Sequence, residues 1–382
     1  MIPYSRQAID DADIEAVVAV LQSDWLTTGP KVAEFEAAFA TYAGATHAVA
    51  VNSGTAALHA VMHARGVGSD DEVIVPANTF VASANCVVYQ GGTPVFADID
   101  AETLVMDPRS VAEKITPRTK GIIAVDFAGL PCDYEALRAL AEEHGLFLHA
   151  DACHALGASY NGRPVGGLAT TSSFSFHPVK PITTAEGGMI TTDDETLASS
   201  MRIFRNHGLS SDFRQREKAQ TWEYDMVDLG WNYRLSDFQC ALGLSQLRKA
   251  DEFFARRNAV ADRYDEAFED LEWLQTPARL SDRTHAFHLY ACQLTEAAPF
   301  SQRDVFQTLR AKGIGVHVMY RPVYLHSYYQ KNFEYAEGTC PVAEQAYRRI
   351  LTLPVSPAMT EADVASVVDA VRTFPAAYSS LS

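Results

Sequence analysis

The sequence lacks a hydrophobic run long enough to cross a bilayer. Its longest apolar stretches are short and interrupted by polar residues, although hydrophobic residues fill 47% of the 382 positions. Residues 1–7 also lack the basic-then-apolar pattern of a signal peptide. With 21% charged residues, the composition is that of a soluble globular protein. We therefore expect a cytoplasmic location and no membrane partner.

Paired cysteines and an excess of positive charge are absent as well. The six cysteines are scattered without a CxxC motif, which predicts reduced thiols rather than a disulfide framework. Acidic residues outnumber basic ones by 48 to 31, and the formal net charge is −17. A surface of this sign disfavours binding to nucleic acid. An anionic ligand therefore requires a local positive pocket.

Strand-like and helix-like segments alternate through the first half of the chain. Strands are predicted over 47–51, 72–76, 94–97, 121–125, 146–150, 172–176 and 189–192, with helices such as 58–65 and 134–144 between them. This order predicts a mostly parallel sheet with helices on both faces, where ligands collect at the carboxyl ends of the strands. Gly54, Phe80, Asp151 and Lys180 all follow predicted strand ends, which indicates a site there.

The pattern changes near residue 250. A long helix is predicted over 236–257, and beyond it helices mix with a few strand-like runs such as 288–294. A chain of 382 residues also exceeds one ordinary hydrophobic core. We therefore expect a large domain over residues 1–250 and a smaller α+β domain over residues 251–382, joined by the long helix. The polar stretch 206–228 is long for a structureless connection, which indicates a function or a subunit contact.

Lys180 stands between Pro178 and Pro181 in a weakly charged stretch, with a predicted strand on each side. The prolines interrupt regular structure around it. If the lysine is desolvated there, its pKa falls and its neutral amine becomes a usable nucleophile and base. A surface lysine on a hairpin loop is the alternative, and this stretch alone does not separate the two.

Gly54 and Thr55 follow a strand and open a helix. Free backbone N–H groups and the helix dipole favour an anion such as phosphate at that position. An ordinary helix cap, with a glycine for close packing, explains the same residues. The turn is therefore a weak signal when taken alone.

Asp151 lies among possible metal ligands, together with His149, Cys153 and His154. Alternation along a strand places His149, Asp151 and Cys153 on one face and His154 beyond the strand end, and no other His or Cys group has matching spacing. These observations disfavour a metal. A carboxylate at a strand end can instead hold a cationic ring nitrogen, as the ring of pyridoxal phosphate requires. A structural aspartate that caps the next turn is the further alternative.

Four features together supply what pyridoxal 5'-phosphate needs. Lys180 offers an amine for a covalent bond, Asp151 a partner for the ring nitrogen, and the Gly54-Thr55 turn a phosphate cradle. Phe80 adds an aromatic ring that can stack on the cofactor. The combination predicts this cofactor, although each feature alone has an ordinary structural explanation.

The longer motifs resemble those of the fold-type-I, pyridoxal-phosphate-dependent nucleotide-sugar aminotransferases of the DegT/DnrJ type. They are LTTGP at 26–30, NSGTA at 52–56, DACHALGA at 151–158, the segment 174–189 and GWNYRLSD at 230–237. The resemblance runs from Tyr4 almost to the C-terminus. It implies an α/β fold with a mostly parallel seven-stranded sheet covered by helices, a smaller α+β C-terminal domain, and an aminotransferase activity.

The resemblance also implies roles for single residues. Lys180 matches the lysine that binds the cofactor covalently and moves the proton, Asp151 the carboxylate at the pyridine nitrogen, and Phe80 the ring-stacking aromatic. The other implied cofactor contacts are Gly54, Thr55 and Ser175 at the phosphate, His154 near the ring hydroxyl, and Asn232 at the phosphate of a neighbouring subunit. Asn232 thus implies a homodimer with shared active sites. Segments that contact the substrate match Tyr4, Leu26, Thr27, Thr28, Gly29 and Tyr320.

The implied substrates are L-glutamate, as the amino donor, and a UDP-linked 4-keto-6-deoxy N-acetyl sugar that accepts the amino group at C4. Another nucleotide-linked 3- or 4-keto sugar remains open. Candidates for the positive charge at the diphosphate are Lys31, Arg205, His207 and Arg321. One departure concerns Met319, because many such enzymes carry a histidine just before the tyrosine that matches Tyr320. Here the nearest histidine is His317, so no histidine role in that loop carries over.

Three rival functions are weighed against the aminotransferase. In a 3-dehydratase of the same fold, histidine replaces the lysine, but Lys180 is intact. A nicotinamide dehydrogenase requires a G-x-G-x-x-G motif after a first strand, and the sequence has none. A non-catalytic regulatory homologue is disfavoured by the complete set of lysine, aspartate and phosphate-type turn. A colourless protein without cofactor absorbance would favour that last alternative.

Overall fold

A seven-stranded sheet forms the centre of the computed structural model, which describes residues 1–379. Its strands lie in the order β1-β9-β8-β5-β4-β2-β3. β9 is antiparallel to both of its neighbours, whereas each of the other contacts, from β8 through β5, β4 and β2 to β3, is parallel. The strands are β1 His47–Val51, β2 Glu72–Pro76, β3 Thr93–Ala97, β4 Thr119–Val125, β5 Phe147–Asp151, β8 Thr171–Ser175 and β9 Gly188–Thr192. The prediction of a mostly parallel seven-stranded sheet is confirmed.

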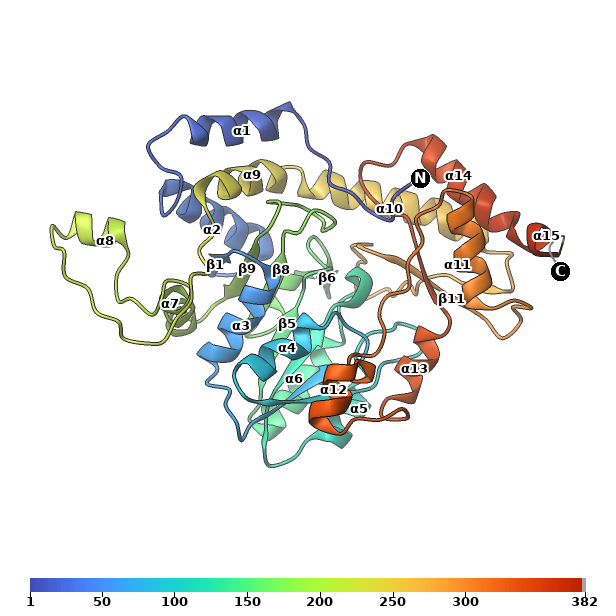
Figure 1. The fold of residues 1–382 in the computed structure, drawn as a ribbon, viewed down its shortest axis with the longest axis horizontal. Coiled ribbons are helices and arrows are strands. Elements are labelled where there is room, and N and C mark those ends of the chain that lie inside the picture. The colour runs from blue at the N-terminus through green and yellow to red at the C-terminus, as the bar shows by residue number, and fades with distance from the viewer. Residues whose placement is uncertain (380–382) are drawn as a thin grey trace.

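Helices cover this sheet, because strands buried on both faces need apolar layers above and below them. Figure 1 shows the helices gathered around the central strands. They are α1 Asp11–Leu21, α2 Pro30–Ala43, α3 Gly54–Ala64, α4 Ala82–Tyr89, α5 Pro108–Lys114, α6 Tyr134–His144, α7 Glu195–Phe204 and α9 Asp237–Leu247. Short elements between them are η1 Phe127–Gly129, β6 Ser159–Tyr160, β7 Arg163–Pro164 and η2 Val165–Gly167.

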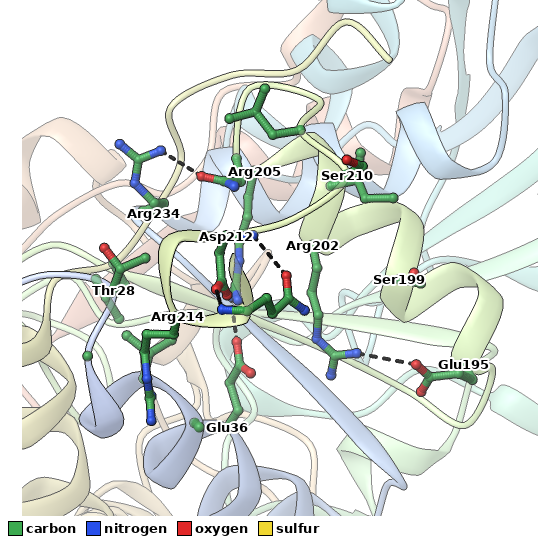
Figure 2. Close-up of a pocket in the computed structure, with 18 residues that line it drawn as sticks. Thr28, Glu36, Glu195, Ser199, Arg202, Arg205, Ser210, Asp212, Arg214 and Arg234 are labelled. Atoms are coloured by element: carbon green, nitrogen blue, oxygen red, sulfur yellow. Dashed lines mark hydrogen bonds and ion pairs between the residues drawn. The ribbon is translucent and has the colours of Figure 1, made fainter. Parts of the chain in front are cut away.

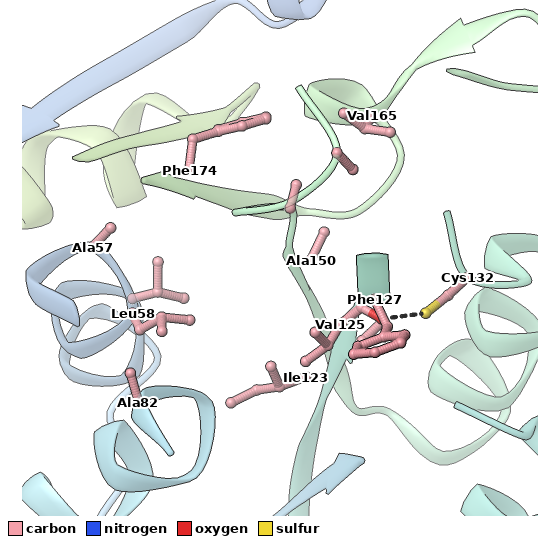
Figure 3. Packing of buried hydrophobic residues seen from close by; sticks show 14 of the residues in the cluster. Ala57, Leu58, Ala82, Ile123, Val125, Phe127, Cys132, Ala150, Val165 and Phe174 are labelled. Atoms are coloured by element: carbon pink, nitrogen blue, oxygen red, sulfur yellow. Dashed lines mark hydrogen bonds between the residues drawn. The ribbon is translucent and has the colours of Figure 1, made fainter. Parts of the chain in front are cut away.

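The core around the sheet is apolar and buried. Figure 3 shows Leu58 of α3 facing the strands, with Ile123 of β4 and Phe174 of β8 in the same cluster. Each of these three side chains is at most 2% exposed. The rigid sheet fixes where its strands end, and β5 ends at Asp151. The core therefore sets the position of the residues predicted to form the site.

The C-terminal part builds a second hydrophobic core. It uses α10 Ala250–Phe268, β10 Leu274–Gln275, β11 Tyr290–Leu294, α11 Gln302–Ala311, β12 Ile350–Leu353, α14 Glu361–Arg372 and α15 Phe374–Ser379. Between these elements, η3 Val323–Leu325, α12 Ser327–Phe333 and α13 Pro341–Tyr347 return to pack on the first core. A division of the chain at residue 250 stays a prediction, since the chain crosses between the two cores more than once.

The predicted long helix over 236–257 is wrong in one respect. The structure has two helices, α9 and α10, which are separated at Arg248 and Lys249. Lys249 has φ −104° and ψ 1°, outside helical geometry. Its Nζ lies 2.6 Å from the Oδ2 atom of Asp13, whose side chain is 1% exposed. No glycine or proline marks this break, so the helical pattern alone could not reveal it.

A segment that we call the arm, residues 206–231, projects from the sheet and carries α8 Phe213–Lys218 (Figure 1). Its base is attached to α3, where His63 Nε2 lies 2.7 Å from Asp228 Oδ2. His59 of the same helix lies 3.0 Å from the hydroxyl of Tyr233, just beyond the arm. The arm exposes large apolar side chains, namely Phe213, Trp222, Tyr224, Met226, Val227, Leu229 and Trp231.

Candidate active site

A cavity of about 480 Å³ lies at the carboxyl ends of the sheet strands. It gathers predicted site residues from segments that are far apart in the sequence. The residues that line it include Tyr4, Gly54, Thr55, Phe80, Asp151, His154, Ser175, Lys180 and Tyr320. The convergence predicted from strand ends is therefore what the fold produces.

The first turn of α3 forms one wall of this cavity. Ser53 caps the helix, since its hydroxyl accepts a hydrogen bond from the N–H of Ala56 at 3.0 Å. The N–H groups of Gly54 and Thr55 precede the first hydrogen bond within the helix and lie at the positive end of its dipole. A Cβ on Gly54 would lie 2.9 Å from Cβ of Ser175, closer than such atoms approach. The glycine therefore lets the helix start come close to Ser175.

Asp151 ends β5 and is 5% exposed. Its Oδ2 atom accepts a hydrogen bond from the hydroxyl of Ser83 at 2.7 Å, and its Oδ1 atom accepts one from the N–H of Cys153 at 3.3 Å. Ser83 in turn lies 2.8 Å from the hydroxyl of Thr79. Since Ser83 donates its single proton to the carboxylate, Thr79 donates to Ser83. This chain of hydroxyls fixes the carboxylate toward the cavity.

Lys180 lies on the loop between β8 and β9, where its backbone N–H donates to the carbonyl of His177 at 2.9 Å. Burial lowers the pKa of the Lys180 amine, while the nearby Cys153 and Asp151 act in the opposite direction. A depressed pKa enlarges the fraction of neutral amine, which is the form that attacks a carbonyl. Lys180 is half-buried and lines the cavity, which favours a sheltered amine over a fully solvated loop lysine.

Two histidines lie side by side at the cavity wall. The rings of His154 and His288 are 4.3 Å apart, and neither residue is more than 5% exposed. In the described chain neither Nδ1 atom has a hydrogen-bond partner. Burial and, next, the charge of Lys180 lower the pKa of both imidazoles well below the ordinary value. Both rings are therefore neutral at pH 7, and they offer unused hydrogen-bonding groups to a ligand.

Aromatic side chains line the rest of the cavity. Phe80 is 55% exposed, with its ring 6.0 Å from that of Tyr320. Tyr320 stacks at 6.2 Å on His154, and its backbone N–H donates to the side chain of Asn78 at 3.2 Å. An exposed aromatic ring at a cavity is positioned to cover a planar ligand. Tyr4 approaches from the N-terminal segment and lines the same cavity.

Several predicted residues lie elsewhere. Asn232 is exposed, and its carbonyl accepts a 3.3 Å hydrogen bond from Asn52. In the 26–30 motif, the N–H of Gly29 donates to Asp237 at 2.7 Å. A Cβ on Gly29 would meet this carboxylate at 2.5 Å, so the glycine lets Asp237 cap α2. The motifs at 26–30 and 230–237 thus bind each other. The following predicted contacts stay predictions: the substrate contacts of Leu26, Thr27, Thr28 and Gly29, and the cofactor contact of Asn232.

Thr28 and Gly29 line a second cavity of about 370 Å³, which we call the arginine cavity (Figure 2). Arg205 points at Glu36, with 2.5 Å between Nη1 and Oε1, and Arg202 reaches Glu195 at 3.7 Å. Arg234 donates to the side chain of Asn206 at 2.8 Å. These arginines are therefore already partnered. The four residues suggested for the diphosphate (Lys31, Arg205, His207 and Arg321) do not line the active-site cavity.

Sequence patterns missed Thr79, Ser83 and His288. Hydroxyl residues at the start of a helix are common, so Thr79 and Ser83 carried no signal before Asp151 was placed beside them. His288 was assigned only to a strand-like run. No group of three His, Cys, Asp or Glu side chains within residues 1–379 has the arrangement of a metal site. His149, one of the possible ligands, instead lies 2.8 Å from the hydroxyl of Thr171.

Comparison with known proteins decides the family. The DegT/DnrJ/EryC1/StrS aminotransferase family matches residues 7–372. The chain belongs to this family. The spore coat polysaccharide biosynthesis protein SpsC of Bacillus subtilis is 43% identical over 374 residues, which cover 97% of this chain and 96% of that protein.

Solved structures agree with this family assignment. The Helicobacter pylori aminotransferase PseC, involved in the biosynthesis of pseudoaminic acid, has a TM-score of 0.91 and 34% identity, with 98% of each chain covered. The PLP form of the putative sugar aminotransferase Spr1654 from Streptococcus pneumoniae has a TM-score of 0.91 and 33% identity, again with 98% of each chain covered. The protein is a pyridoxal-phosphate-dependent sugar aminotransferase of fold type I, as the sequence predicted.

The residues present fit this cofactor. The missing Cβ of Gly54 leaves room beside Ser175 at a helix N-terminus, which suits a phosphate. Asp151 and His154 line the cavity, where a ring nitrogen and a ring hydroxyl need partners, and the Nδ1 atom of His154 has no hydrogen-bond partner in the described chain. Lys180 adds an amine with a lowered pKa in the same space.

Proposed function

We propose that this aminotransferase moves the amino group of L-glutamate to the C4 ketone of a UDP-linked 4-keto-6-deoxy N-acetyl sugar. The observation that carries the chemistry is the shared cavity of Lys180 and Asp151, which also contains the phosphate-type turn at Gly54. The similarity to PseC over nearly the full chain supports a role in pseudaminic acid biosynthesis. A cytoplasmic location remains a prediction, and no helix within residues 1–379 is long and apolar enough to cross a membrane.

In this proposal several segments of the chain share the binding of the cofactor. The start of α3, with Gly54 and Thr55, and the hydroxyl of Ser175 hold the phosphate. Asp151 holds the positively charged ring nitrogen, and His154 donates toward the ring hydroxyl. Phe80 covers the face of the ring. Bound there, pyridoxal phosphate supplies an electron sink for the charge that develops on the substrate carbon.

Lys180 then carries out the proton transfers. With pyridoxal phosphate bound, the neutral amine of Lys180 would take the proton from the α-carbon of glutamate and hold it until it is returned later in the same half-reaction. Asp151 keeps its negative charge next to the ring nitrogen, so that the developing charge is balanced. The second half-reaction uses the same groups in reverse order, with the sugar ketone in place of the oxo acid.

A second candidate substrate is another nucleotide-linked 3- or 4-keto sugar. It is favoured by SpsC, which is more similar to this chain than PseC is and is named for spore coat polysaccharide biosynthesis. Met319 also lines the cavity, at the position where many similar enzymes carry a histidine. A thioether cannot donate a hydrogen bond to a sugar hydroxyl or phosphate, so this wall differs in what it recognises.

The test is a substrate panel. The purified protein, loaded with pyridoxal phosphate, is incubated with ¹⁵N-labelled glutamate and with UDP- and dTDP-linked 3-keto and 4-keto sugars. We expect mass spectrometry to show ¹⁵N in the UDP-linked 4-keto-6-deoxy N-acetyl sugar, and NMR to place the new amine at C4. Label found only in a 3-amino or dTDP-linked product would reject this substrate and select the second candidate.

We further propose that the enzyme works as a homodimer with shared sites. The arm exposes Trp222 by 84%, Leu229 by 75% and Met226 by 61%. Single chains rarely leave so many large apolar side chains in water, which supports a protein partner. Asn232 directly follows the arm and pairs with Asn206 at the arm's start. It is exposed, as a residue that contacts a neighbouring subunit must be.

Complementation tests the shared site. Lys180→Ala and Asn232→Ala proteins are each inactive or nearly so, and they are mixed under conditions that exchange subunits. A mixed dimer contains one site with both Lys180 and Asn232 intact. Random pairing then restores about a quarter of wild-type activity. No recovery, with exchange verified by differently tagged subunits, would place Asn232 outside the partner's site.

A further inference from the structure

A buried arginine without an acidic partner lies behind the active-site cavity. Arg257 belongs to α10, is 1% exposed, and forms no ion pair with the carboxylates of the described residues. It is held by oxygen atoms that carry no net charge. An isolated buried cation is unfavourable unless its donors are satisfied, and here the Nε atom has no partner within residues 1–379.

The guanidinium of Arg257 joins three segments, and two of them continue into the wall of the cavity. Its Nη1 atom donates to the carbonyls of Phe287 at 3.2 Å and Val355 at 2.9 Å, and its Nη2 atom donates to the hydroxyl of Ser5 at 3.4 Å. Phe287 directly precedes His288, and the N–H of Val355 donates to the carbonyl of Tyr4 at 3.0 Å. Both Tyr4 and His288 line the cavity.

Ser5 links Arg257 to the loop between β8 and β9 that contains Lys180. Its hydroxyl donates to the carbonyl of Val179 at 3.1 Å, and Val179 is the residue before Lys180. One side chain from the second core thus determines where the N-terminal segment crosses the loop of the reactive amine. A rigid planar fork suits this arrangement, because several acceptors are bound at fixed angles.

The charge of Arg257 acts on the same groups. Burial lowers the pKa of Arg257 to about 10, so the guanidinium is still protonated at pH 7. Burial is the main cause of the lowered pKa of Lys180, and the positive charge of Arg257 lowers it further. The other titratable groups that line the cavity with the amine are Tyr4, Asp151, Cys153, His154, His177, Glu186, His288 and Tyr320. Arg257 is the permanent cation of this set.

We propose that Arg257 is a positioning residue for transamination, which holds the Tyr4–Ser5 segment and the Lys180 loop against the cavity and places a fixed positive charge behind the amine. The inference rests on the proposed role of Lys180. It predicts that loss of the charge moves the titration of the Lys180 amine to higher pH. It also predicts that loss of the Ser5 hydroxyl loosens the loop without moving the titration.

The test labels lysines in the cofactor-free full chain with trace acetic anhydride over a pH series, and quantifies the Lys180 peptide by mass spectrometry. Exposed Lys331 serves as the internal reference. Arg257→Gln keeps an amide donor for the carbonyls but removes the charge. We expect its Lys180 midpoint to rise by about half a pH unit, so that labelling at pH 7 falls about threefold. A loss of packing that admits water would also raise this midpoint, so the Ser5→Ala variant, which loosens the same loop but keeps the charge of Arg257, measures that contribution.

Ser5→Ala is the matched variant, since it keeps the charge of Arg257 and removes only the hydroxyl that joins Arg257 to Val179. We expect an unchanged midpoint, faster hydrogen exchange at residues 4–6 and 179–181, and a KM for the keto sugar raised about threefold with little change in kcat. An unchanged midpoint in folded Arg257→Gln protein, or unchanged exchange in Ser5→Ala protein, would overturn the proposal.

A parallel control separates this proposal from the proposed function. Wild-type protein is incubated with pyridoxal phosphate and reduced with borohydride, and the attachment site is identified. Attachment at a residue other than Lys180 would reject the proposed function, and the proposed positioning role of Arg257 would be rejected with it. Attachment at Lys180, combined with unchanged titration in Arg257→Gln protein, removes only the role of Arg257.

Discussion

The active-site cavity and the arginine cavity differ in how their polar groups are satisfied. In the arginine cavity, Arg205 binds Glu36 and Arg234 donates to Asn206, so these two guanidinium groups have partners before any ligand arrives (Figure 2). In the active-site cavity, His154 and His288 keep buried nitrogen atoms without a partner in the described chain. Buried polar groups are normally paired, so unpaired ones mark where a ligand completes the structure. The difference separates a site of chemistry from a structural or subunit surface.

The strongest test of this comparison is the loss of Lys180. Lys180→Ala removes both the covalent bond to the cofactor and the proton carrier, so we expect turnover to fall by at least about 10⁴-fold. Absorbance of the loaded protein, before and after borohydride treatment, is the measurement. Lys331→Ala removes an exposed lysine and should match wild type. Covalent trapping that survives in Lys180→Ala protein would contradict the assignment.

Asp151→Asn tests the carboxylate at the ring nitrogen. We expect the cofactor to bind but turnover to fall by about 10²- to 10³-fold, because the amide no longer balances the positive ring. Steady-state kinetics with glutamate gives the value. Asp126→Asn is the matched control, since Asp126 is also buried but binds Cys132 and Tyr134 outside the cavity. Equal losses in both variants would show that the effect is structural.

Gly54→Ala tests the phosphate cradle. The added Cβ meets Ser175 at 2.9 Å, so the start of α3 must move away from the bound phosphate. We expect the dissociation constant of the cofactor to rise about tenfold, measured by fluorescence titration. Ala64→Gly, at the other end of the helix, loosens α3 by about 1 kcal/mol but leaves the cradle intact. A weaker cofactor complex only in the Ala64 variant would contradict this role.

Arg205→Met tests the other half of the comparison. Removal of one partner leaves Glu36, with a side chain 13% exposed, without its cation, so we expect the free energy of unfolding to fall by about 3 kcal/mol. The kcat should stay within about threefold of wild type. Arg202→Met breaks the more exposed pair with Glu195 and should cost at most about 1 kcal/mol. A large rise in KM for the sugar in Arg205→Met protein would instead make the arginine cavity part of the substrate site.

The sequence allowed much of the site to be predicted because its residues follow strand ends. Asp151 and Gly54 occupy such positions, and a parallel sheet brings them together at one edge. Ser83 and Arg257 escaped prediction for a different reason. Both lie on helices where serine and arginine are ordinary, and only tertiary packing shows that one binds Asp151 and the other is enclosed.

The break between α9 and α10 could not be predicted for a similar reason. At the break, Lys249 contacts the buried carboxylate of Asp13, which is 236 residues away in the chain. Local propensity contains no information about such a partner. The 26–30 motif, likewise, suggested substrate contacts, whereas within one chain Gly29 serves the capping of α2 by Asp237.

The helix α3 has one end in the cavity and its other half against the arm. Gly54 and Thr55 begin it, while His59 and His63 farther along bind Tyr233 and Asp228. The same helix thus connects the phosphate-type turn with the exposed apolar arm. Linkage between two sites is reciprocal, so a partner that strengthens cofactor binding through this helix must itself bind the cofactor-loaded protein more tightly, by the same factor.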